Sequence, residues 1–255
     1  MISVPQQPKV TALGENHSKF EILGCYPGYG ATLGNAIRRV LLSSLEGAAA
    51  RSVKIKGVSH EFTSIPGVME DAVQILLNLK QLRFRLHGDE TVKVTLKAKG
   101  EGDVKAGDIK APSSVEIVNP DQRIATLTDK KAEFEMELEI GKGIGYVPVE
   151  AREHEEREIG MIALDAIYTP VRRVNYEIEN MRVGKRTDYD KVSIEVVTDG
   201  SITPEEAFAK AIAILVEQFS AIRIETVSSA EVVAEEKPKK KASAKKAAKK
   251  EESEE

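Results

Sequence analysis

The feature that most constrains this chain is a regular alternation of apolar and polar side chains along several short stretches. Residues 132–140 alternate almost without error, and residues 52–56 and 91–97 follow the same pattern. A period of two places apolar side chains on one face of a β-strand and charged side chains on the other, as in antiparallel sheets with one face in water. The middle third of the chain is therefore predicted to be mostly antiparallel sheet.

Turn-rich clusters and further alternation predict additional strands on both sides of this segment. Pro148 restricts its own stretch to an extended segment, because proline cannot sit inside a central strand. These strands are expected at residues 10–13, 19–23, 115–118, 123–127, 146–149, 173–179 and 191–197, with residues 182–190 linking the last two.

Apolar residues at helical spacing predict two helices in the first third of the chain. Thr32 is a suitable N-cap for a helix that continues to Leu45, and Gly47 is placed to end it. A second helix is expected over roughly residues 68–79, between two of the alternating strands.

The last predicted helix carries the most specific pattern. Thr203 as N-cap, Pro204 at the first helical position and Glu206 form a capping-box signature, and the helix continues to about residue 222. Its apolar residues have the spacing of a coiled-coil seam. Such a face either covers its own sheet or also pairs with a second copy, and the pattern leaves both open. The seam residues are Phe208, Ile212, Leu215, Phe219 and Ile222.

Composition bounds the class of protein. With 255 residues, of which 41% are hydrophobic, the chain can bury a sizeable core. No apolar run approaches the roughly 20 residues that span a bilayer, and the first residues do not have the pattern of a secretory signal. The single cysteine, Cys25, excludes a disulfide framework and a cysteine-based zinc cluster, so we expect a soluble protein in a reducing compartment.

The net charge of −4 is unevenly distributed, because residues 237–255 hold eight lysines and four glutamates. Residues 230–255 contain almost no large apolar side chains, so we expect a disordered tail. A lysine run of this kind either contacts phosphates non-specifically, with salt-sensitive affinity, or only solubilises the chain. The candidate phosphate contacts are Lys239, Lys240, Lys241, Lys245 and Lys246.

No motif indicates an active site. Residues 27–34 are glycine-rich, but a dinucleotide loop needs a third glycine where Leu33 stands. The four histidines lack metal-ligand spacing, and no serine, cysteine or carboxylate pair has the context of a nucleophile or an acid–base pair. We therefore expect a scaffold that binds no metal ion or cofactor, and the two strongly apolar helices suggest that it is oligomeric.

Residues 29–49 resemble the hallmark helix of the bacterial RNA polymerase alpha-subunit family, in its N-terminal domain. The resemblance covers about residues 9–225 without a break in order, and several motifs in series are more specific than any one alone. The other matching segments are residues 57–62, 67–71, 76–80, 115–120, 145–148, 165–170 and 186–191.

This resemblance implies an α+β fold with two subdomains. Residues 1–47 and 172–229 would form a discontinuous dimerisation subdomain, made of an antiparallel sheet and two helices. Residues 48–171 would be an inserted, mostly antiparallel β subdomain, and residues 230–255 the tail. The family usually continues through a linker into a small helical domain that binds promoter DNA and activators. This sequence has the lysine-rich tail instead. Binding of promoter DNA and activators through such a domain is therefore not expected of this chain.

The resemblance also implies partners. Two copies would form a homodimer on which the beta and beta-prime subunits assemble, with omega and sigma also in the complex and DNA bound through the holoenzyme. The chain would be a cytoplasmic, nucleoid-associated, membrane-free subunit of a nucleotidyltransferase, without catalytic residues of its own. The alternative function is a nucleic-acid-binding module that acts through the basic tail.

Site residues are carried over from the family position by position. Arginine suits such contacts, since its planar guanidinium binds carboxylates with two hydrogen bonds. Gly34 and Asn35 are expected to serve a tight entry into the first helix. The beta interface would comprise Arg38, Arg39, Leu42, Leu77, Asn78, Leu79 and Lys80; the beta-prime interface Val174, Tyr176, Arg182, Arg186, Thr187 and Asp188; and the dimer interface Leu33, Ile37, Val40, Phe208, Ile212, Leu215 and Phe219.

Overall fold

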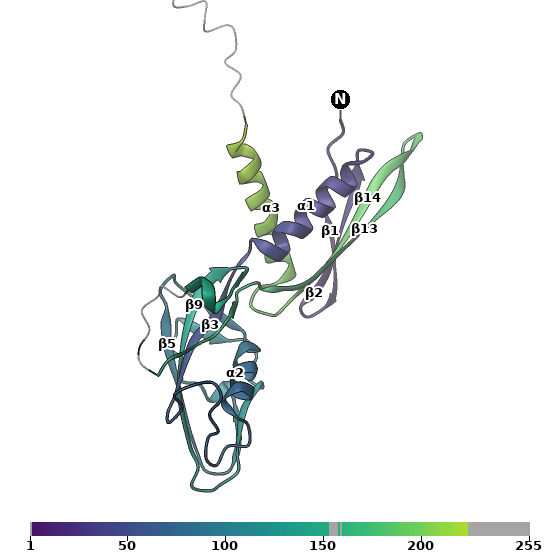
Figure 1. Cartoon of the computed structure of the whole chain (residues 1–255). Helices are drawn as coiled ribbons and strands as arrows, with labels where there is room; N and C mark the ends of the chain where they lie inside the picture. Colours follow the sequence, from purple (N-terminus) through teal and green to yellow (C-terminus); the bar gives the residue numbers. More distant parts are fainter. Residues whose placement is uncertain (1, 153–157, 159, 224–255) are drawn as a thin grey trace, which may run out of the picture. The chain divides into compact units, whose positions relative to one another are not determined.

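The computed structural model describes residues 2–152, 158 and 160–223. These residues form an α+β fold with three α-helices and mostly antiparallel sheets, as predicted (Figure 1). The chain divides into two compact units, residues 1–217 and 218–255. The expected tail at residues 230–255 lies outside the described residues.

One four-stranded antiparallel sheet combines both ends of the first unit. The hairpin predicted from residues 10–13 and 19–23 is confirmed, with Val10 opposite Phe20. The predicted link at residues 182–190 is wrong, because the last two strands continue through it and Val183 pairs with Arg186. Its side chains are mostly exposed, so it shows no alternation. In sheet order the strands are β1 (Lys9–Gly14), β2 (His17–Cys25), β14 (Arg186–Thr198) and β13 (Val171–Val183).

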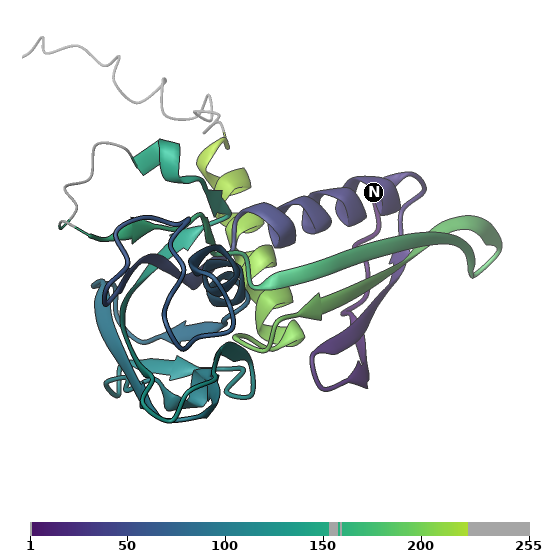
Figure 2. The same ribbon diagram turned by 60° about the horizontal axis from the view of Figure 1, so that its bottom comes forward.

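Helix α1 (Tyr29–Ser43) packs across β13 and β14 (Figures 1 and 2). It begins earlier than Thr32, because Gly28 is the N-cap, with a φ of 84° that glycine adopts without strain. It also ends before Gly47, which lies in a strand. A Cβ at Gly47 would be 1.8 Å from the carbonyl oxygen of Tyr168, so a close backbone approach, rather than helix termination, requires glycine there.

Helix α3 (Pro204–Ala221) begins with the predicted capping box. The Glu206 backbone N–H donates to Thr203 Oγ1 at 3.2 Å, and the Thr203 N–H donates to the Glu206 carboxylate at 3.4 Å. Phe208 then stacks on Phe20 of β2, with ring centroids 4.3 Å apart. The start of α3 therefore covers its own four-stranded sheet.

A six-stranded sheet with a separate core is formed by the middle of the chain. Helix α2 (Ala72–Lys80) packs against this core and begins after residue 68, because Asp71 caps it by accepting from the Gln74 N–H at 2.8 Å. The strands, in order, are β5 (Val92–Lys99), β9 (Glu133–Ile144), β3 (Glu46–Ile55), β4 (Phe84–Leu86) and β7 (Val115–Ile117), with β11 (Ile162–Ala163) beside β3.

Two small strand pairs complete the middle segment. The extended segment expected at residues 146–149 is shorter, because a 3₁₀ turn, η2 (Val149–Arg152), begins directly after Pro148. A second 3₁₀ turn, η1, covers Ala106–Asp108. The pairs are β6 (Gly102–Lys105) with β8 (Arg123–Leu127), and β10 (Tyr146–Val147) with β12 (Ala166–Ile167).

The alternation of residues 132–140 corresponds to a strand with one apolar and one charged face, as predicted. Its apolar residues Phe134, Met136 and Leu138 are buried, whereas its glutamates face lysines of neighbouring strands. Glu133 lies 2.7 Å from Lys99, and Glu135 pairs with Lys97. These hydrogen bonds lower the pKa of Glu133 and of Glu135 below the ordinary value of a glutamate side chain.

The described residues contain two large hydrophobic cores. One lies between residues 50 and 164, around α2 and the six-stranded sheet. The other joins residues 20–45 with residues 171–211, beneath α1 and the start of α3.

Candidate subunit interfaces

The outer face of α1 presents the predicted arginine pair. Gly30, Gly34, Ile37 and Leu41 form its buried face, whereas Arg39 is exposed. Arg38 and Leu42 are half-buried, and they share one side of the helix because they are four residues apart. Within the described residues, the buried Nε of Arg38 makes no hydrogen bond. Arg39 is thus the more accessible of the two arginines.

The position of α1 is fixed by a carboxylate that sequence analysis missed. Asp190 on β14 is buried, and one of its oxygens accepts the backbone N–H groups of Gly28 at 2.9 Å and Gly30 at 3.0 Å. An anion at a helix N-terminus satisfies free N–H groups and interacts favourably with the helix dipole. Asp190 thereby holds the arginine-bearing helix on the sheet.

Close packing also sets the distance of α1 from the sheet. A Cβ at Gly34 would lie 2.8 Å from the ring of Tyr176, and one at Gly30 would lie 2.8 Å from the Asp190 Cβ. Gly34 is in the second turn of the helix, so its expected role in the helix entry is wrong. It permits α1 to pack against Tyr176.

The four consecutive α2 residues assigned to the beta interface differ in their surroundings. Leu77 is 54% exposed, whereas Leu79 is buried in the core and has no surface to offer a partner. Asn78 donates from Nδ2 to the Ile124 carbonyl at 3.0 Å, and Lys80 Nζ lies 2.7 Å from Asp165. The hydrogen bond from Lys80 lowers the pKa of Asp165 below its usual range. Asn78 and Lys80 therefore tie α2 to its own domain.

An exposed aromatic ring extends the surface around Leu77. Phe62 is 77% exposed and borders a groove of about 400 Å³ beside α2. The sequence offered only Phe62's place in a matching motif, since a single aromatic residue in a loop has no periodicity. The apolar residues that line the groove are Phe62, Val73, Leu76, Leu77, Val149, Ala163 and Leu164.

The β13–β14 hairpin brings four of the predicted beta-prime residues to the surface. Arg182, Arg186, Thr187 and Asp188 are exposed. Val174 is buried and Tyr176 half-buried beneath α1, so these two support the hairpin from inside.

An ion pair and three tyrosines give the turn end of this hairpin a defined arrangement. Arg186 donates to both carboxylate oxygens of Asp188, at 3.0 and 2.6 Å, which lowers the pKa of Asp188 and raises that of Arg186. Its guanidinium lies 5.7 Å from the Tyr26 ring centroid and 5.4 Å from that of Tyr189. Tyr29 packs edge-on against Tyr26. Tyrosine and arginine are enriched at protein interfaces.

The residues assigned to the dimer interface become more exposed along α3. Phe208 is buried, Ile212 and Leu215 are half-buried against the core, and Phe219 is 63% exposed. On α1, Ile37 is buried in the core, and Leu33 and Val40 are half-buried. Buried Phe208 and Ile37 cannot supply contact surface. The candidate phosphate contacts, Lys239, Lys240, Lys241, Lys245 and Lys246, lie outside the described residues.

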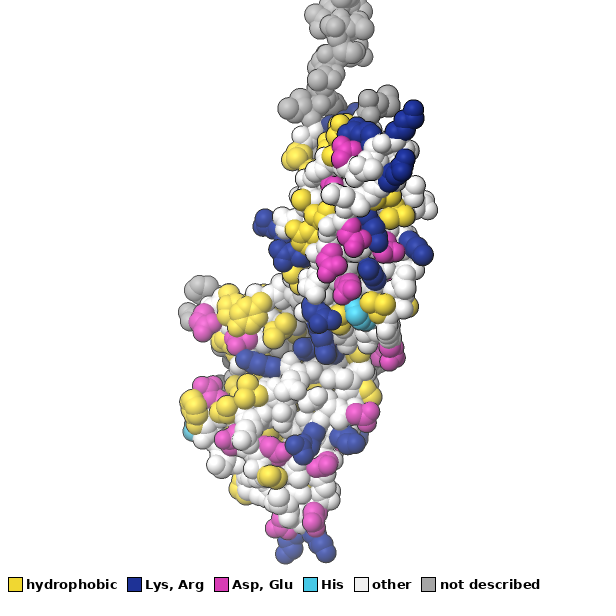
Figure 3. Space-filling model, turned by 90° about the vertical axis from the view of Figure 1, so that its right-hand side faces the viewer, with side chains coloured by type: hydrophobic (Ala, Val, Ile, Leu, Met, Phe, Trp, Pro, Cys, Tyr) yellow, Lys and Arg dark blue, Asp and Glu magenta, His cyan; other side chains and the backbone are white. Residues whose placement is uncertain are grey.

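The face of the molecule in Figure 3 does not separate charges into one large field. On the face in Figure 3, basic and acidic side chains are interspersed with apolar ones. Within the described ranges, no cluster of three or more His, Cys, Asp or Glu side chains is arranged to hold a metal ion. Nor does any described helix have the length and apolar character to cross a membrane.

Comparison with known proteins identifies relatives of this chain. Residues 53–169 match the family model described as the RNA polymerase Rpb3/RpoA insert domain. The DNA-directed RNA polymerase subunit alpha of Alkaliphilus oremlandii is 51% identical over 219 residues, which cover 84% of this chain and 69% of the relative.

Other relatives have the same name. The subunit alpha of Symbiobacterium thermophilum is 51% identical over 216 residues, covering 83% of this chain and 68% of the relative. That of Geobacter metallireducens is 50% identical over 214 residues, covering 84% and 63%. This similarity favours the assembly interpretation over a module that acts through its tail. The chain belongs to the family of bacterial DNA-directed RNA polymerase alpha subunits.

Proposed function

We propose that this chain is an assembly subunit of DNA-directed RNA polymerase, which dimerises and presents docking surfaces to the beta and beta-prime subunits. The observation that carries the proposal is the identity of about half of the aligned residues to named alpha subunits, over 84% of the chain. Nucleotidyl transfer would be an activity of the complex, with catalytic residues in the partners. Omega, sigma and DNA would join the same cytoplasmic complex.

The two proposed subdomains correspond to the two hydrophobic cores. The core that joins residues 20–45 with residues 171–211 would belong to the dimerisation subdomain, because α1 and α3 both pack on it. The core between residues 50 and 164 would belong to the inserted subdomain. Two separate cores support this division, since each subdomain can then bury its own apolar residues.

The beta subunit would dock on Arg38, Arg39 and Leu42 of α1 and on Leu77 of α2, with Phe62 as an added apolar anchor. An exposed arginine on α1 and exposed apolar side chains around α2 have the composition typical of such a contact. Asn78, Leu79 and Lys80 would contribute from inside, by holding α2 in place.

The beta-prime subunit would dock on the exposed hairpin residues Arg182, Arg186, Thr187 and Asp188. Pairing with Asp188 holds the Arg186 side chain in one direction, so less conformational entropy would be lost on binding.

The second copy would pack on the exposed end of α3 and the half-buried apolar residues of α1 and α3. The increasing exposure along α3 supports this, because most of the apolar surface of Phe219 is not covered by its own fold.

The decisive experiment is co-purification of tagged chain with the beta subunit, comparing Arg39→Ala with Arg173→Ala. Both arginines are exposed, but Arg173 directly precedes buried Val174 on β13, so its side chain lies on the side of the strand opposite α1. We expect Arg39→Ala to remain a folded dimer in light scattering and to recover much less beta subunit, whereas Arg173→Ala recovers as much as the parent chain. Equal recovery by both variants would refute the assignment of α1.

A further inference from the structure

Two arginines at the start of strand β4 lie on the same face, one directly before the strand and one within it. Arg83 and Arg85 are two residues apart, so their side chains point to the side opposite Phe84 and Leu86, which are buried in the core around α2. Both arginines reach the turn between β14 and α3. A strand of the inserted core is thereby joined to the segment from which α3 begins.

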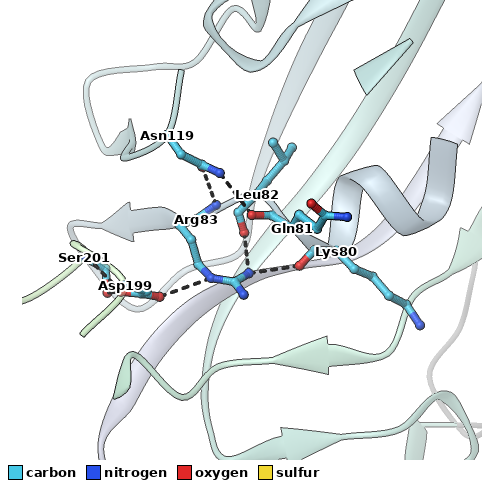
Figure 4. Close-up of polar contacts among 7 residues, drawn as sticks. All are labelled: Lys80, Gln81, Leu82, Arg83, Asn119, Asp199 and Ser201. Atoms are coloured by element: carbon cyan, nitrogen blue, oxygen red, sulfur yellow. Dashed lines mark hydrogen bonds and ion pairs between the residues drawn. The ribbon is translucent and has the colours of Figure 1, made fainter. Parts of the chain in front are cut away.

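Arg83 links three parts of the chain (Figure 4). Its Nη1 donates to the carbonyl oxygens of Lys80 and Leu82, both at 2.9 Å, at the end of α2. Its Nε lies 3.3 Å from the Asp199 carboxylate. Its backbone N–H donates to Asn119 Oδ1 at 2.8 Å. The guanidinium group therefore joins the end of α2 to the end of β14.

The turn at Asp199 is shaped to receive both arginines. The other Asp199 oxygen accepts the backbone N–H of Ser201 at 2.9 Å and its hydroxyl at 2.6 Å. Arg85 donates to the carbonyl oxygens of Ser201 at 2.8 Å and Gly200 at 3.2 Å. Gly200 has a φ of 94°, and a Cβ there would lie 2.9 Å from a methyl group of Val118. Polar bonds and close packing thus hold the turn in one geometry.

Because the Arg83–Asp199 ion pair is buried, its energy depends strongly on how the two charged groups are arranged. The Asp199 side chain is only 5% exposed, and burial lowers the pKa of Arg83 while Asp199 opposes that shift. A buried pair contributes little net stability, because desolvation offsets the attraction between the charges, but it penalises arrangements in which one charge loses its partner. Its expected effect is therefore on orientation more than on stability.

We propose that Arg83, Arg85 and Asp199 form a positioning clamp that fixes the orientation of the α2 surface relative to the start of α3. The clamp rests on the proposed function in one respect: it orients the α2 surface assigned to the beta subunit relative to the helix α3 assigned to the second copy. A scaffold that engages more than one partner site gains affinity only when its surfaces are spaced to engage together. Loosening the clamp would weaken assembly without altering any contact residue.

The first measurement is made on the chain alone, by the distance between two spin labels. The labels replace Glu15, in the β1–β2 turn, and Glu101, between β5 and β6, both exposed, in a Cys25→Ala background. Excess unlabelled chain removes distances between copies. Asp199→Asn removes the charge that faces Arg83. Asp121→Asn is the matched control, because the Asp121 side chain is 98% exposed.

We expect Asp199→Asn to broaden the distance distribution or add a second distance, whereas Asp121→Asn leaves it unchanged. An unchanged distribution in Asp199→Asn would overturn the clamp. If Asp199→Asn does not fold, Arg83→Lys serves in its place. Lysine keeps the charge but cannot donate to the two carbonyl oxygens and Asp199 with the same planar group.

The second measurement separates failure of the clamp from failure of the proposed function. The full chain is purified with the beta and beta-prime subunits, and Asp199→Asn should recover less of the complete complex than the parent or Asp121→Asn. If the parent recovers no complex, the proposed function fails, and the spin-label result still decides the clamp. If the distribution broadens but recovery is normal, the orientation does not govern assembly and the positioning role is refuted.

Discussion

Removal of the Asp190 carboxylate should destabilise the chain by releasing the N-terminus of α1. In Asp190→Ala the backbone N–H groups of Gly28 and Gly30, which donate to one carboxylate oxygen at 2.9 and 3.0 Å, lose their acceptor. Loss of a helix N-cap costs about 0.5–2 kcal/mol, and leaving a buried donor unpaired costs about 1–3 kcal/mol. Because water can reach the exposed Gly28, we expect a total of about 2–4 kcal/mol.

The assay is urea unfolding at one fixed protein concentration, since association of copies would add to the apparent stability. The same loss should lower the melting temperature by about 5–15 °C for a folded unit of this size. Asp190→Asn retains one oxygen and should lose roughly half as much stability. Asp188→Ala is the matched control on the same strand, and its exposed ion pair with Arg186 should contribute less than about 1 kcal/mol.

Hydrogen exchange locates the effect. In Asp190→Ala the amides at the start of α1 should exchange faster, whereas those of α2, in the other core, should not change. The reasoning would be refuted if Asp190→Ala cost no more stability than Asp188→Ala, or if the exchange increase were spread over both cores.

Three further results are expected. Phe219→Glu should leave folding intact, because the side chain is exposed, and should convert the proposed dimer to monomers in light scattering; a persistent dimer would exclude this end of α3 from the contact. Gly34→Val should cost about 1–3 kcal/mol in urea unfolding, because its Cβ would meet the Tyr176 ring, and Tyr176→Ala should recover part of that loss; additive losses would argue against the contact. The pKa of Asp165 is lowered mainly by its hydrogen bond to Lys80, so the stability contributed by this pair is present above the unfolded pKa of about 3.9 and is lost as the pH falls through the lower folded value. Lys80→Met should therefore reduce stability at pH 7 by up to about 1 kcal/mol and make stability less sensitive to pH below about 4. Unfolding curves measured over a pH series test this, and the same loss of stability below pH 4 in the variant as in the parent chain would contradict it.

Short-range patterns were sufficient for the elements that depend on neighbouring residues. The alternation of residues 132–140 predicted a strand with a buried apolar face, and Phe134, Met136 and Leu138 are buried there. Thr203 and Glu206 predicted the start of α3, and both capping hydrogen bonds form. Such signals succeed because a strand or a cap is decided within a few residues.

Matched motifs identified the candidate surfaces, but they could not sort the residues within them. Leu77 and Leu79 are both leucines in one matching segment, yet one is exposed and the other buried, since the direction of each depends on which side of α2 meets the core. The charge of Lys80 is likewise paired within the fold, with the carboxylate of Asp165. A linear motif does not distinguish a side chain that contacts a partner from one that supports the contact.

The sequence by itself determined the fold class, the main strands, the start of α3 and the family of the chain, because local periodicity, capping chemistry and ordered motifs are written along the chain. Only the tertiary structure decided how Asp190 caps α1, how Gly34 meets Tyr176 and how Arg83 reaches Asp199. Each of these contacts joins residues that are far apart in sequence. Their geometry depends on sheet order and on the return of the chain through β13 and β14, which no local pattern specifies.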